Sequence, residues 1–347
     1  MGKLNFPKYQ FSMLRKNLAI DMGTTNTLIY VPRHGIVLQE PSVVAVGKYN
    51  EQVLAVGKKA LLMLGKTPAD IEAIRPLQNG VIADFKHARL MLQHFLWKVI
   101  KQLPLIKMRA IITVPYSTTQ VERQAIITAA KRIGIKEIYL IEEPLAAAIG
   151  TGIPIEEKNS SVIINLGGGV TEVAAISFGG IVYASSIRQG GSSLDAAIQR
   201  YLYHQHSLEI GFNTAEAIKK DIGYAYDPPN HSAFRTKGLN WQTLKPDQTV
   251  VTAAEINEAI TPVLYPLTTA IKEVFENVHP QFASDVYKRS ILLVGGGALL
   301  KNIDVFLQNE LKLPVQIAQE PLTCTISGAS KAIRYLKHLN YLELYRA

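Results

Sequence analysis

The sequence has little that would support disulfide bonding, membrane spanning or nucleic-acid binding. It contains one cysteine, Cys324, so no disulfide can form within the chain, and we expect a reducing compartment. No apolar run approaches the roughly 18 residues that a membrane-spanning helix needs, and residues 1–17 lack the apolar core of a signal peptide. Neither paired zinc ligands nor a basic stripe with interleaved aromatics is present, which argues against a nucleic-acid-binding module.

Common catalytic signatures are missing as well. The sequence has no Ser-His-Asp order, no HExxH, no CxxC and no GxxxxGK[ST] loop, and its eight histidines are scattered. We therefore expect no metal site beyond the Mg²⁺ of a bound nucleotide. What is present is a chain of 347 residues with 48% hydrophobic content, enough for two domains with sizeable cores, and a net charge of +9. That charge favours an anionic partner, such as a nucleotide or an anionic membrane face.

Residues 18–31 carry the first informative motif. Apolar residues lead to Asp21, a polar turn runs from Gly23 to Thr27, and apolar residues follow to Val31. The pattern predicts a strand, a tight turn and a returning strand. A turn of glycine and small hydroxyl residues leaves room for a phosphate, and a carboxylate at its mouth suits hydrated Mg²⁺. The alternative is an ordinary glycine-containing hairpin.

A second copy of this motif occupies residues 161–177. The turn is now Gly167, Gly168 and Gly169, and Thr171 takes the place of Thr27. Both threonines either bond phosphate oxygens or serve as ordinary strand residues. A third glycine turn, residues 295–297, also follows an apolar run. Two copies half a chain apart predict a duplicated domain, and together the three turns predict a nucleotide-binding cleft.

The remaining periodicity predicts helices and strands in alternation. We expect helices at 87–101, 120–134, 194–205, 214–223 with Thr214 as N-cap, and 253–278 despite Pro262. Residues 224–250 read as a surface insertion containing a hairpin. The order of strands and helices in the first half indicates a sheet with helices on its faces. Glu142 and Glu143 are expected in a turn, where one carboxylate would orient or deprotonate an attacking water.

Two segments have both a structural and a membrane interpretation. Leu103, Leu105 and Ile106 surround Pro104 between basic residues; they either tuck under their own domain or enter a membrane interface, with lysines on the headgroups. Residues 1–17 mix basic and aromatic residues, and are either a frayed terminus or a membrane-surface segment.

These residues resemble the MreB family of bacterial actin homologues, over about residues 17–335. The stretches that carry the resemblance are NLAIDMGTTNTLIYV, GIVLQEPSVVAV, AIRPLQNGVIADF, VERQAIITAAKRIG, YLIEEPLAAAIGTGIPIEE, LGGGVTEVAAISFGGIV, TAEAIKKDIG and ILLVGGGALL. The resemblance implies an α/β, actin-like (ribonuclease H-like) fold with duplicated domains, mixed sheets flanked by helices, and a nucleotide cleft between them.

The resemblance also implies domain boundaries. It places an N-terminal segment at 1–17, a first domain at 18–150 with a small subdomain at about 35–85, a second domain at 151–335 with a small subdomain at about 192–262, and a tail at 336–347 that can pack on the first domain.

The family's site residues carry over onto matching positions. The resemblance implies that ATP-Mg is held by Asp21 (through metal-bound water), by Gly23, Thr24, Thr25 and Asn26, by Asn165, Gly167, Gly168, Gly169, Val170 and Thr171, by Glu216 and Lys219 at ribose and adenine, and by Gly296, Gly297 and Ala298 at adenosine. It assigns the hydrolytic water to Glu143, and a membrane-inserting role to Leu103, Leu105 and Ile106.

Partners and location follow from the same resemblance. Family members stack head to tail into protofilaments that pair antiparallel on the inner face of the cell membrane. We therefore expect a cytoplasmic, peripheral membrane protein that serves cell shape or cell organisation, with itself, anionic lipid and membrane-embedded morphogenesis proteins as partners, and no nucleic acid.

The chain departs from the family pattern at the second hairpin. Asn165 stands where the family has Asp, Val170 where it has Thr, and residues 191–195 read GSSLD instead of GDEMD. Losing one contact to developing charge typically costs about 10²-fold in rate. We expect slow or absent ATP hydrolysis, so the sequence does not decide whether the chain is an ATPase. The alternatives are a non-hydrolysing scaffold filament for motility or organelle positioning, and a soluble ATPase or kinase of the same superfamily. A kinase would need a catalytic Asp near Asn165.

Overall fold

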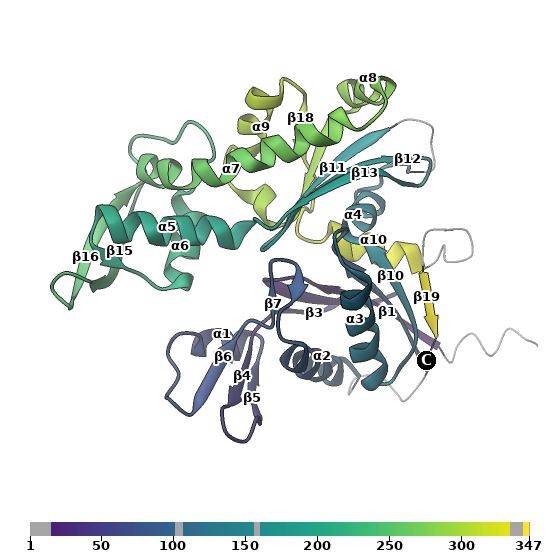
Figure 1. The fold of residues 1–347 in the computed structure, drawn as a ribbon, viewed down its shortest axis with the longest axis horizontal. Coiled ribbons are helices and arrows are strands. Elements are labelled where there is room, and N and C mark those ends of the chain that lie inside the picture. Colours follow the sequence, from purple (N-terminus) through teal and green to yellow (C-terminus); the bar gives the residue numbers. More distant parts are fainter. Residues whose placement is uncertain (1–14, 101–106, 156–159, 334–342, 347) are drawn as a thin grey trace, which may run out of the picture. The chain divides into compact units, whose positions relative to one another are not determined.

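The computed structural model describes residues 15–100, 107–155, 160–333 and 343–346. The chain forms two compact units (Figure 1), residues 1–150 with 325–347, called unit 1, and residues 151–324, called unit 2. Residues 1–14 and the loop at 101–106, for which the sequence suggests membrane roles, lie outside the described residues. In the described part of the chain, no helix combines the length and apolarity needed to cross a membrane.

Unit 1 is built on one large mixed sheet with a small sheet beside it. Its elements are β1 (Arg15–Met22), β2 (Asn26–Val31), β3 (Gly35–Pro41), β4 (Val44–Gly47), β5 (Val53–Val56), α1 (Lys58–Met63), β6 (Ile71–Ile74), β7 (Leu77–Gln78), β8 (Val81–Ile82), α2 (Phe85–Ile100), β9 (Lys107–Val114), α3 (Gln120–Arg132), β10 (Ile135–Glu142), α4 (Glu143–Thr151), α10 (Cys324–Ala332) and β19 (Glu343–Arg346). The large sheet has the order β19-β10-β9-β1-β2-β3, and the small one β5-β4-β6.

Apolar periodicity explains how the helices of unit 1 pack. The buried side of α2 includes Met91, Phe95 and Leu96, which join a core with Ile20 of β1 and Ile112 of β9. Helix α3 starts with a capping box, in which Thr119 and Glu122 satisfy each other's backbone N–H groups. The middles of the central strands, residues 18–20 of β1 and 110–114 of β9, are buried, as parallel strands covered by helices require.

Unit 2 repeats the sheet of unit 1. Its elements are β11 (Ser161–Leu166), β12 (Thr171–Ser177), β13 (Gly180–Ile187), α5 (Gly191–Gln205), β14 (Leu208–Glu209), α6 (Phe212–Ile222), β15 (Ala233–Asn240), β16 (Lys245–Thr252), α7 (Ala253–Glu276), α8 (Pro280–Arg289), β17 (Ile291–Val294), the 3₁₀ helix η2 (Gly296–Leu299), α9 (Ile303–Leu311) and β18 (Val315–Ile317). The order β13-β12-β11-β17-β18 reproduces β3-β2-β1-β9-β10, with antiparallel and parallel pairings at the same places. The duplication predicted from sequence is therefore visible in the topology.

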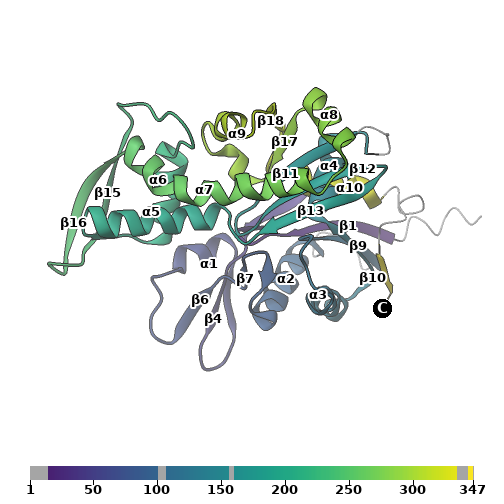
Figure 2. The same cartoon turned by 45° about the horizontal axis from the view of Figure 1, so that its top comes forward.

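Helix α7 is the longest helix of unit 2 among the described residues. It runs along the sheet, in contact with β12 and β13 (Figure 2). The helix continues through Pro262 and Pro266, because Ile256, Ile260 and Leu264 bury its apolar side in the unit 2 core. Burial of this stripe outweighs the hydrogen bonds that the prolines remove.

A three-stranded sheet, β14-β15-β16, extends beside α5, α6 and α7 (Figure 1). Strands β15 and β16 form a hairpin that begins in the polar insertion expected at 224–250 and extends two residues beyond it, with Ala233 paired to Thr252 and Asn240 to Lys245.

Two local expectations are wrong. Glu142 and Glu143 do not lie in a turn: Glu142 ends β10 and Glu143 begins α4 directly. Thr214 is not an N-cap, since α6 begins at Phe212 and its N-cap is Gly211, without a side-chain hydrogen bond. In each case helical dihedrals begin earlier than the polar cue suggested, because buried residues of the helix, such as Ala215, set its register against the core.

Candidate functional site

The first glycine turn joins β1 to β2 in unit 1. It is closed by a hydrogen bond from the Gly23 amide to the Asn26 carbonyl, at 3.0 Å. A Cβ at position 23 would meet the Asn26 carbonyl at 2.9 Å, so the turn is tight enough to demand glycine. Asp21 lies at the end of β1, immediately before the turn.

Four contacts from outside the hairpin hold this turn, and one is the bond from the Ser42 amide to the Thr25 carbonyl, at 2.8 Å. Ser42 Oγ donates to the Gly23 carbonyl at 2.7 Å and lies 2.9 Å from Thr27 Oγ1, while the Gly80 amide donates to Thr24 Oγ1 at 3.1 Å. Thr27 is fully buried, so its hydroxyl serves the fold here, which favours the structural reading of the two offered by the sequence. Ser42 lies in the stretch GIVLQEPSVVAV that carries the family resemblance, but it was not singled out as a site residue.

The second glycine turn, in unit 2, has the same construction. The Gly167 amide donates to the Val170 carbonyl at 2.9 Å, matching the closure at Gly23. The first amides of α5 hold its carbonyls: Gly191 N donates to Gly167 O at 3.0 Å, and Ser192 N to Gly168 O at 2.8 Å. When the carbonyls of a turn face one way, its N–H groups face the other, which is the arrangement that binds anions.

The residues flanking the second turn are buried. Thr171 is 4% exposed and its hydroxyl donates to the Gln189 carbonyl at 2.8 Å. Like the hydroxyl of Thr27, it serves the fold. Val170 is 7% exposed and Asn165 is 4% exposed. Asn165 lies directly opposite Glu172, a fully buried carboxylate that accepts from Ser186 Oγ at 3.1 Å. The side chain at position 165 therefore has one buried carboxylate, that of Glu172, as its cross-strand neighbour.

Asp21 is a carboxyl whose charged form is opposed by burial. Burial raises the pKa of Asp21 to about 6, although the hydrogen bond from Thr113 Oγ1, at 2.8 Å, acts to lower it. A nearby cation would restore the charged form. Among the described residues, no three His, Cys, Asp or Glu side chains gather as a metal cluster. The donor set thus fits Mg²⁺ only if phosphates and water supply the other ligands.

The structure separates the roles of the two neighbouring glutamates. Glu142 forms an ion pair with Arg123 of α3, Oε1 to Nη2 at 2.9 Å, and both side chains are mostly buried. Glu143 instead begins α4, where the helix N-terminus favours a carboxylate. Of the two, Glu143 is therefore the better candidate for handling a water molecule.

Helix α6 positions Glu216 and Lys219 differently. Glu216 pairs with Lys220 one turn on, at 2.7 Å. The Lys219 ammonium lies 2.7 Å from Asp195 Oδ1 and donates to the Gly191 carbonyl at 2.9 Å. Burial raises the pKa of Asp195, while Lys219 acts to lower it. This pair ties α6 to the start of α5, which in turn holds the second glycine turn.

The third glycine turn packs against the second within unit 2. Gly295 has φ +85°, and a Cβ there would meet the Leu166 carbonyl at 2.5 Å and Asn165 Oδ1 at 2.8 Å. Gly297 approaches Leu166 similarly. Unit 2 thus brings together the second and third turns, α5 and Lys219, which lie far apart in sequence.

A small cavity lies behind these turns in unit 2. It measures about 30 Å³, enough for one or two waters. Its wall includes Gly167, Gln189 and Gly297, and its apolar lining includes Leu264 and Leu300. The buried Oε1 of Gln189 has no hydrogen-bond partner among the described residues. Sequence reasoning did not single out Gln189, because one polar residue near a turn carries no pattern.

Comparison with known proteins gives a consistent result. The model of the MreB/Mbl protein family matches residues 15–341. The chain is 44% identical over 333 residues to the cell shape-determining protein MreB of Escherichia coli, covering 93% of this chain and 95% of that protein. It is 40% identical over 316 residues to the cell shape-determining protein Mbl of Bacillus subtilis, covering 91% and 95%.

Solved structures extend the comparison. The crystal structure of MreB5 of Spiroplasma citri bound to ADP matches with a TM-score of 0.88 and 34% identity, covering 93% of this chain and 98% of that one. The MamK double helical filament matches with a TM-score of 0.78 and 20% identity, covering 92% and 99%; at that identity the likeness concerns the fold alone.

Proposed function

Because the chain belongs to the MreB/Mbl family and has the actin-like fold, we propose that it is a cytoskeletal protein that binds ATP-Mg and assembles into filaments serving cell shape or cell organisation. The family and fold predicted from sequence are confirmed. Relatives in the comparisons are described as cell shape-determining proteins, and MreB5 of Spiroplasma citri as bound to ADP or AMPPNP.

One observation carries the nucleotide part of the proposal. The two units present hairpins of the same construction, each closed by an amide-to-carbonyl bond across its glycine turn, Gly23 to Asn26 and Gly167 to Val170. A phosphate-binding role explains why one tight, glycine-requiring turn recurs in both halves. Asp21 would act on Mg²⁺ through its bound water, and Lys219, Glu216 and residues 296–298 would contact ribose and adenine.

Calorimetry with ATP and MgCl₂ tests this part of the proposal. We expect saturable binding by the full chain and a loss of at least tenfold in affinity for Asp21→Asn, because the carboxylate facing the cation is removed. Glu209→Gln, an exposed change in β14, is the matched control and should bind normally. Absence of binding by the unaltered chain to both ATP and GTP in the presence of Mg²⁺ would refute the nucleotide proposal.

We also propose that hydrolysis is slow. Asn165 lacks the charge that helps to organise Mg²⁺ and water, and Val170 lacks a hydroxyl. We expect the double variant Asn165→Asp/Val170→Thr to release phosphate at least about tenfold faster than the unaltered chain. Glu143→Gln, added to that double variant, should abolish the gain. Equal release by the unaltered chain and the double variant would refute the impairment.

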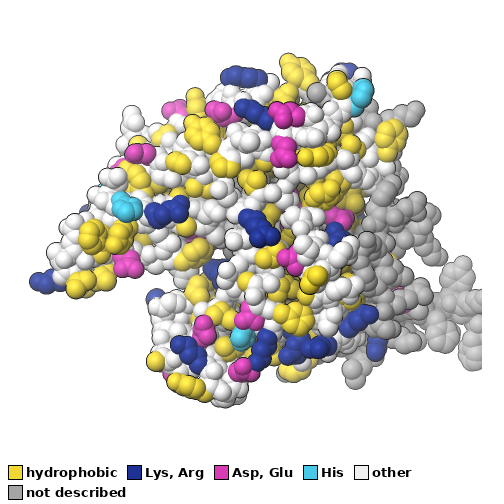
Figure 3. Space-filling model, in the orientation of Figure 1, with side chains coloured by type: hydrophobic (Ala, Val, Ile, Leu, Met, Phe, Trp, Pro, Cys, Tyr) yellow, Lys and Arg dark blue, Asp and Glu magenta, His cyan; other side chains and the backbone are white. Residues whose placement is uncertain are grey.

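An exposed apolar surface offers a contact for self-assembly in unit 2. We call it the hairpin-end surface; it consists of Tyr203, Leu239, Trp241 and Leu244, which are 38%, 40%, 38% and 75% exposed. Figure 3 shows hydrophobic side chains gathered at the end of the β15–β16 hairpin. Trp241 stacks on Tyr203 with ring centroids 5.1 Å apart. Rigid aromatic groups of this kind dominate the energetics of protein interfaces.

Pelleting with ATP-Mg tests the assembly proposal. Leu244→Asp should abolish sedimentation while leaving nucleotide affinity unchanged, because it places a charge on the hairpin-end surface without touching either glycine turn. Val182→Asp, another exposed apolar position, is the control and should sediment normally. Electron microscopy should show filaments only where pelleting occurs, and normal filaments of Leu244→Asp would remove this surface from the contact.

We also propose that the chain binds an anionic membrane face through Leu103, Leu105 and Ile106, and the charge at one end of the unit 1 sheet supports this. Strands β9 and β10 are parallel neighbours, so both begin at this end of the sheet. Exposed Lys131 and Arg132 end α3 there, and exposed Lys136 follows. The acid beside them, Glu137, is paired with Arg109 at 2.6 Å. Residues 101–106 directly precede β9 in the chain, and a basic surface at the start of β9 and β10 is suited to anionic headgroups.

Vesicle co-sedimentation tests the membrane proposal. Substituting Leu103, Leu105 and Ile106 by Ser should reduce binding to phosphatidylglycerol-containing vesicles at least tenfold, since it removes the apolar insertion. Substituting Lys131 and Lys136 by Gln should weaken binding to those vesicles but not to neutral ones. If the triple Ser variant binds as well as the unaltered chain, the loop is not the membrane contact.

A further inference from the structure

A buried ion pair within unit 2 joins α6 to the first turn of α5. Asp195 Oδ1 lies 2.7 Å from Lys219 Nζ, and the same ammonium donates to the Gly191 carbonyl at 2.9 Å. The Asp195 side chain is 2% exposed and that of Lys219 is 14% exposed. Charges buried to this degree depend on each other, because removing one partner leaves the other poorly solvated. The pair therefore fixes where α6 meets α5.

The neighbouring lysine on α6 has a different environment. The Lys220 side chain is 69% exposed and pairs with Glu216 of the same helix, at 2.7 Å; exposed pairs of this kind contribute little. Lysine has three N–H donors, and the contacts of Lys219 with Asp195 and Gly191 engage two of them. Most of the hydrogen-bonding capacity of Lys219 is thus used inside unit 2, and one N–H remains for a nucleotide.

Gly191 is held through both of its backbone groups. Its carbonyl accepts from Lys219, and its amide donates to the Gly167 carbonyl at 3.0 Å. The next amide, that of Ser192, donates to the Gly168 carbonyl at 2.8 Å. A Cβ at Gly191 would meet Lys219 Nζ at 3.3 Å, so the ammonium packs directly on the first residue of α5. One residue of the chain thus connects Lys219 to the second glycine turn.

The two bonds from α5 also fix the direction of two amides in that turn. In a trans peptide, the C=O and the N–H of the next residue point in opposite directions. Because the Gly167 carbonyl is turned toward Gly191, the Gly168 N–H faces away from α5. The Gly168 carbonyl fixes the Gly169 N–H in the same way. Successive N–H groups that face one way bind anions, so the start of α5 sets the direction in which the turn offers its donors.

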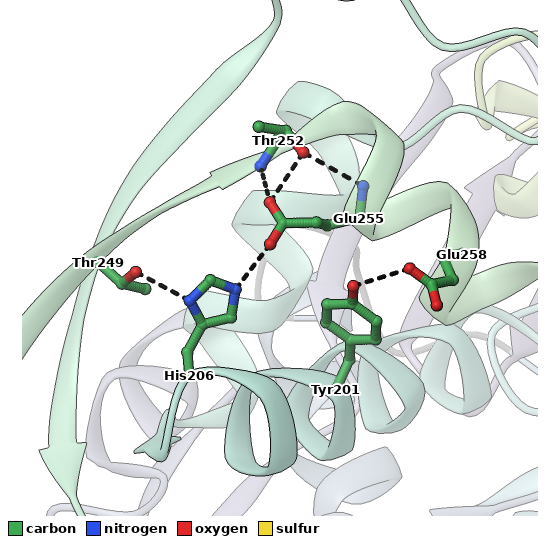
Figure 4. Close-up of polar contacts among 6 residues, drawn as sticks. All are labelled: Tyr201, His206, Thr249, Thr252, Glu255 and Glu258. Atoms are coloured by element: carbon green, nitrogen blue, oxygen red, sulfur yellow. Dashed lines mark hydrogen bonds and ion pairs between the residues drawn. The ribbon is translucent and has the colours of Figure 1, made fainter.

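The far end of α5 is tied to α7 (Figure 4). Tyr201 Oη donates to Glu258 at 2.9 Å, and His206 Nε2 lies 2.9 Å from Glu255 Oε1. The apolar side of the helix packs in the unit 2 core. Loss of the contact with Lys219 should therefore loosen the first turn of α5, next to the glycine turn, without displacing the rest of the helix.

We propose that Asp195 and Lys219 act together as positioning residues for the triphosphate chain of the bound nucleotide, because they hold the start of α5 and, through it, the amides of the second glycine turn. This role of Lys219 at the phosphate end is separate from its contact with ribose and adenine, and it rests on the proposed function. Asp195 is the only acid in residues 191–195, GSSLD, so no other residue of this stretch can take its place.

Calorimetry with two ligands tests where the pair acts. Tripolyphosphate with MgCl₂ carries the phosphate chain of ATP without ribose or base. Asp195→Asn removes the charge at nearly constant size, so it should weaken binding of tripolyphosphate and of ATP by the same factor, about tenfold, the equivalent of one charge-assisted hydrogen bond. Glu216→Gln, at the proposed ribose and adenine end, should weaken ATP alone. Lys219→Gln should match Asp195→Asn with tripolyphosphate, while Lys272→Gln, which removes an exposed charge on α7, is its charge-matched control and should change neither affinity.

Amide hydrogen exchange measures the same contact without a ligand. The amides of Gly191 and Ser192 should exchange at least about tenfold faster in Asp195→Asn and in Lys219→Gln, because the start of α5 is freed. The amide of Val173, in β12, should keep its rate, which separates local loosening from a loss of global stability. The double variant Asp195→Asn/Lys219→Gln leaves no unpaired charge, so it covers the case in which a single variant does not fold. Its losses should equal those of the single variants, since the two side chains act as one unit.

The outcomes distinguish the positioning role from the proposed function. Equal losses for both ligands together with faster exchange support the role. If Asp195→Asn weakens ATP but leaves tripolyphosphate binding unchanged, the pair acts at the base and the role is overturned. Unchanged exchange at Gly191 and Ser192 in the folded variants overturns it as well, whatever the affinities. If the unaltered chain binds no nucleotide, the proposed function fails, and the exchange rates still decide whether the pair holds the glycine turn.

Discussion

At the residue scale, Asp21 is the carboxyl that we propose to act on the cation of a bound nucleotide. Its pKa of about 6 exceeds the ordinary value, so the folded state holds the proton more tightly than the unfolded state. The stability that this group contributes is therefore fully present below about pH 4 and is lost as pH rises to about 6. A cation at the site would offset that loss, because it favours the ionised carboxylate.

Asp21→Asn should accordingly raise the stability of the folded chain while weakening its binding of ATP-Mg. Between pH 4 and pH 7.5 without nucleotide, the free energy of unfolding of the unaltered chain should fall by about 1–3 kcal/mol more than that of the variant. Urea unfolding at both pH values measures this. ATP-Mg should raise the melting temperature of the unaltered chain more than that of the variant, which binds it at least tenfold more weakly. An equal pH dependence in the two proteins would contradict the assignment.

Gln189 is a second residue whose environment predicts a result. Its buried Oε1 is unpartnered among the described residues and borders a small apolar cavity. Gln189→Leu should stabilise the protein by about 1 kcal/mol, because it removes the unpaired oxygen and fills space. The bond from Thr171 uses the backbone carbonyl and survives. Gln199→Leu, which breaks a 2.8 Å bond to the Ile210 carbonyl, should instead destabilise, and thermal unfolding compares the two.

At the scale of elements, the junction of β10 with α4 depends on α3. Arg123 reaches from α3 to Glu142 and, through Nε, to the Thr118 carbonyl at 3.4 Å. Both side chains of this pair are mostly buried, so removing one partner would leave the other charge poorly solvated. The ion pair thereby holds the end of β10, from which Glu143 and α4 follow.

A double-mutant cycle at this junction measures the coupling. Arg123→Gln should destabilise the protein by about 1–3 kcal/mol, because it leaves a partly buried carboxylate without its cation. Adding Glu142→Gln to that variant should recover at least half of the loss. Additive losses in urea unfolding would show that the two side chains do not interact, and that α3 does not hold the junction electrostatically.

The first residues of α4 and α6 show where local sequence patterns predict a helix boundary wrongly. Thr214 and the polar stretch at Glu142 both carry local signals for boundaries, yet packing starts α6 at Phe212 and α4 at Glu143. Helix α7, by contrast, follows its apolar period through two prolines. Buried periodic residues decide where a helix lies, and polar cues adjust its ends.

At the scale of the whole molecule, the repeated sheet topology and the net charge of +9 point to different partners. The repeat places one glycine turn in each unit, which suits a nucleotide. The charge suits an anionic surface and does not depend on the fold.

The electrostatic part of membrane binding should therefore respond to salt. We expect binding to phosphatidylglycerol-containing vesicles to fall at least tenfold between 50 and 500 mM NaCl, because screening shortens the reach of surface charges. The affinity of the proposed nucleotide site, whose residues are partly buried, should change much less over the same range. Salt-independent vesicle binding would show that insertion of apolar residues alone accounts for membrane attachment.

The sequence by itself determined the family, the duplicated architecture, the glycine turns and most helices. These features follow from patterns that can be recognised in the sequence alone: apolar periods, glycines at tight turns, and similar stretches recurring half a chain apart. Residues such as Gly23 and Gly167 are identifiable because the local backbone alone demands them.

Only the tertiary structure decided which side chains act together. Thr113 meets Asp21 across 92 positions, and His206 joins Thr249 and Glu255 from different elements. Such contacts depend on how strands and helices pack over long sequence separations, and no local pattern records them. The same is true of the raised pKa of Asp21, because burial is a property of the folded chain and not of the residue.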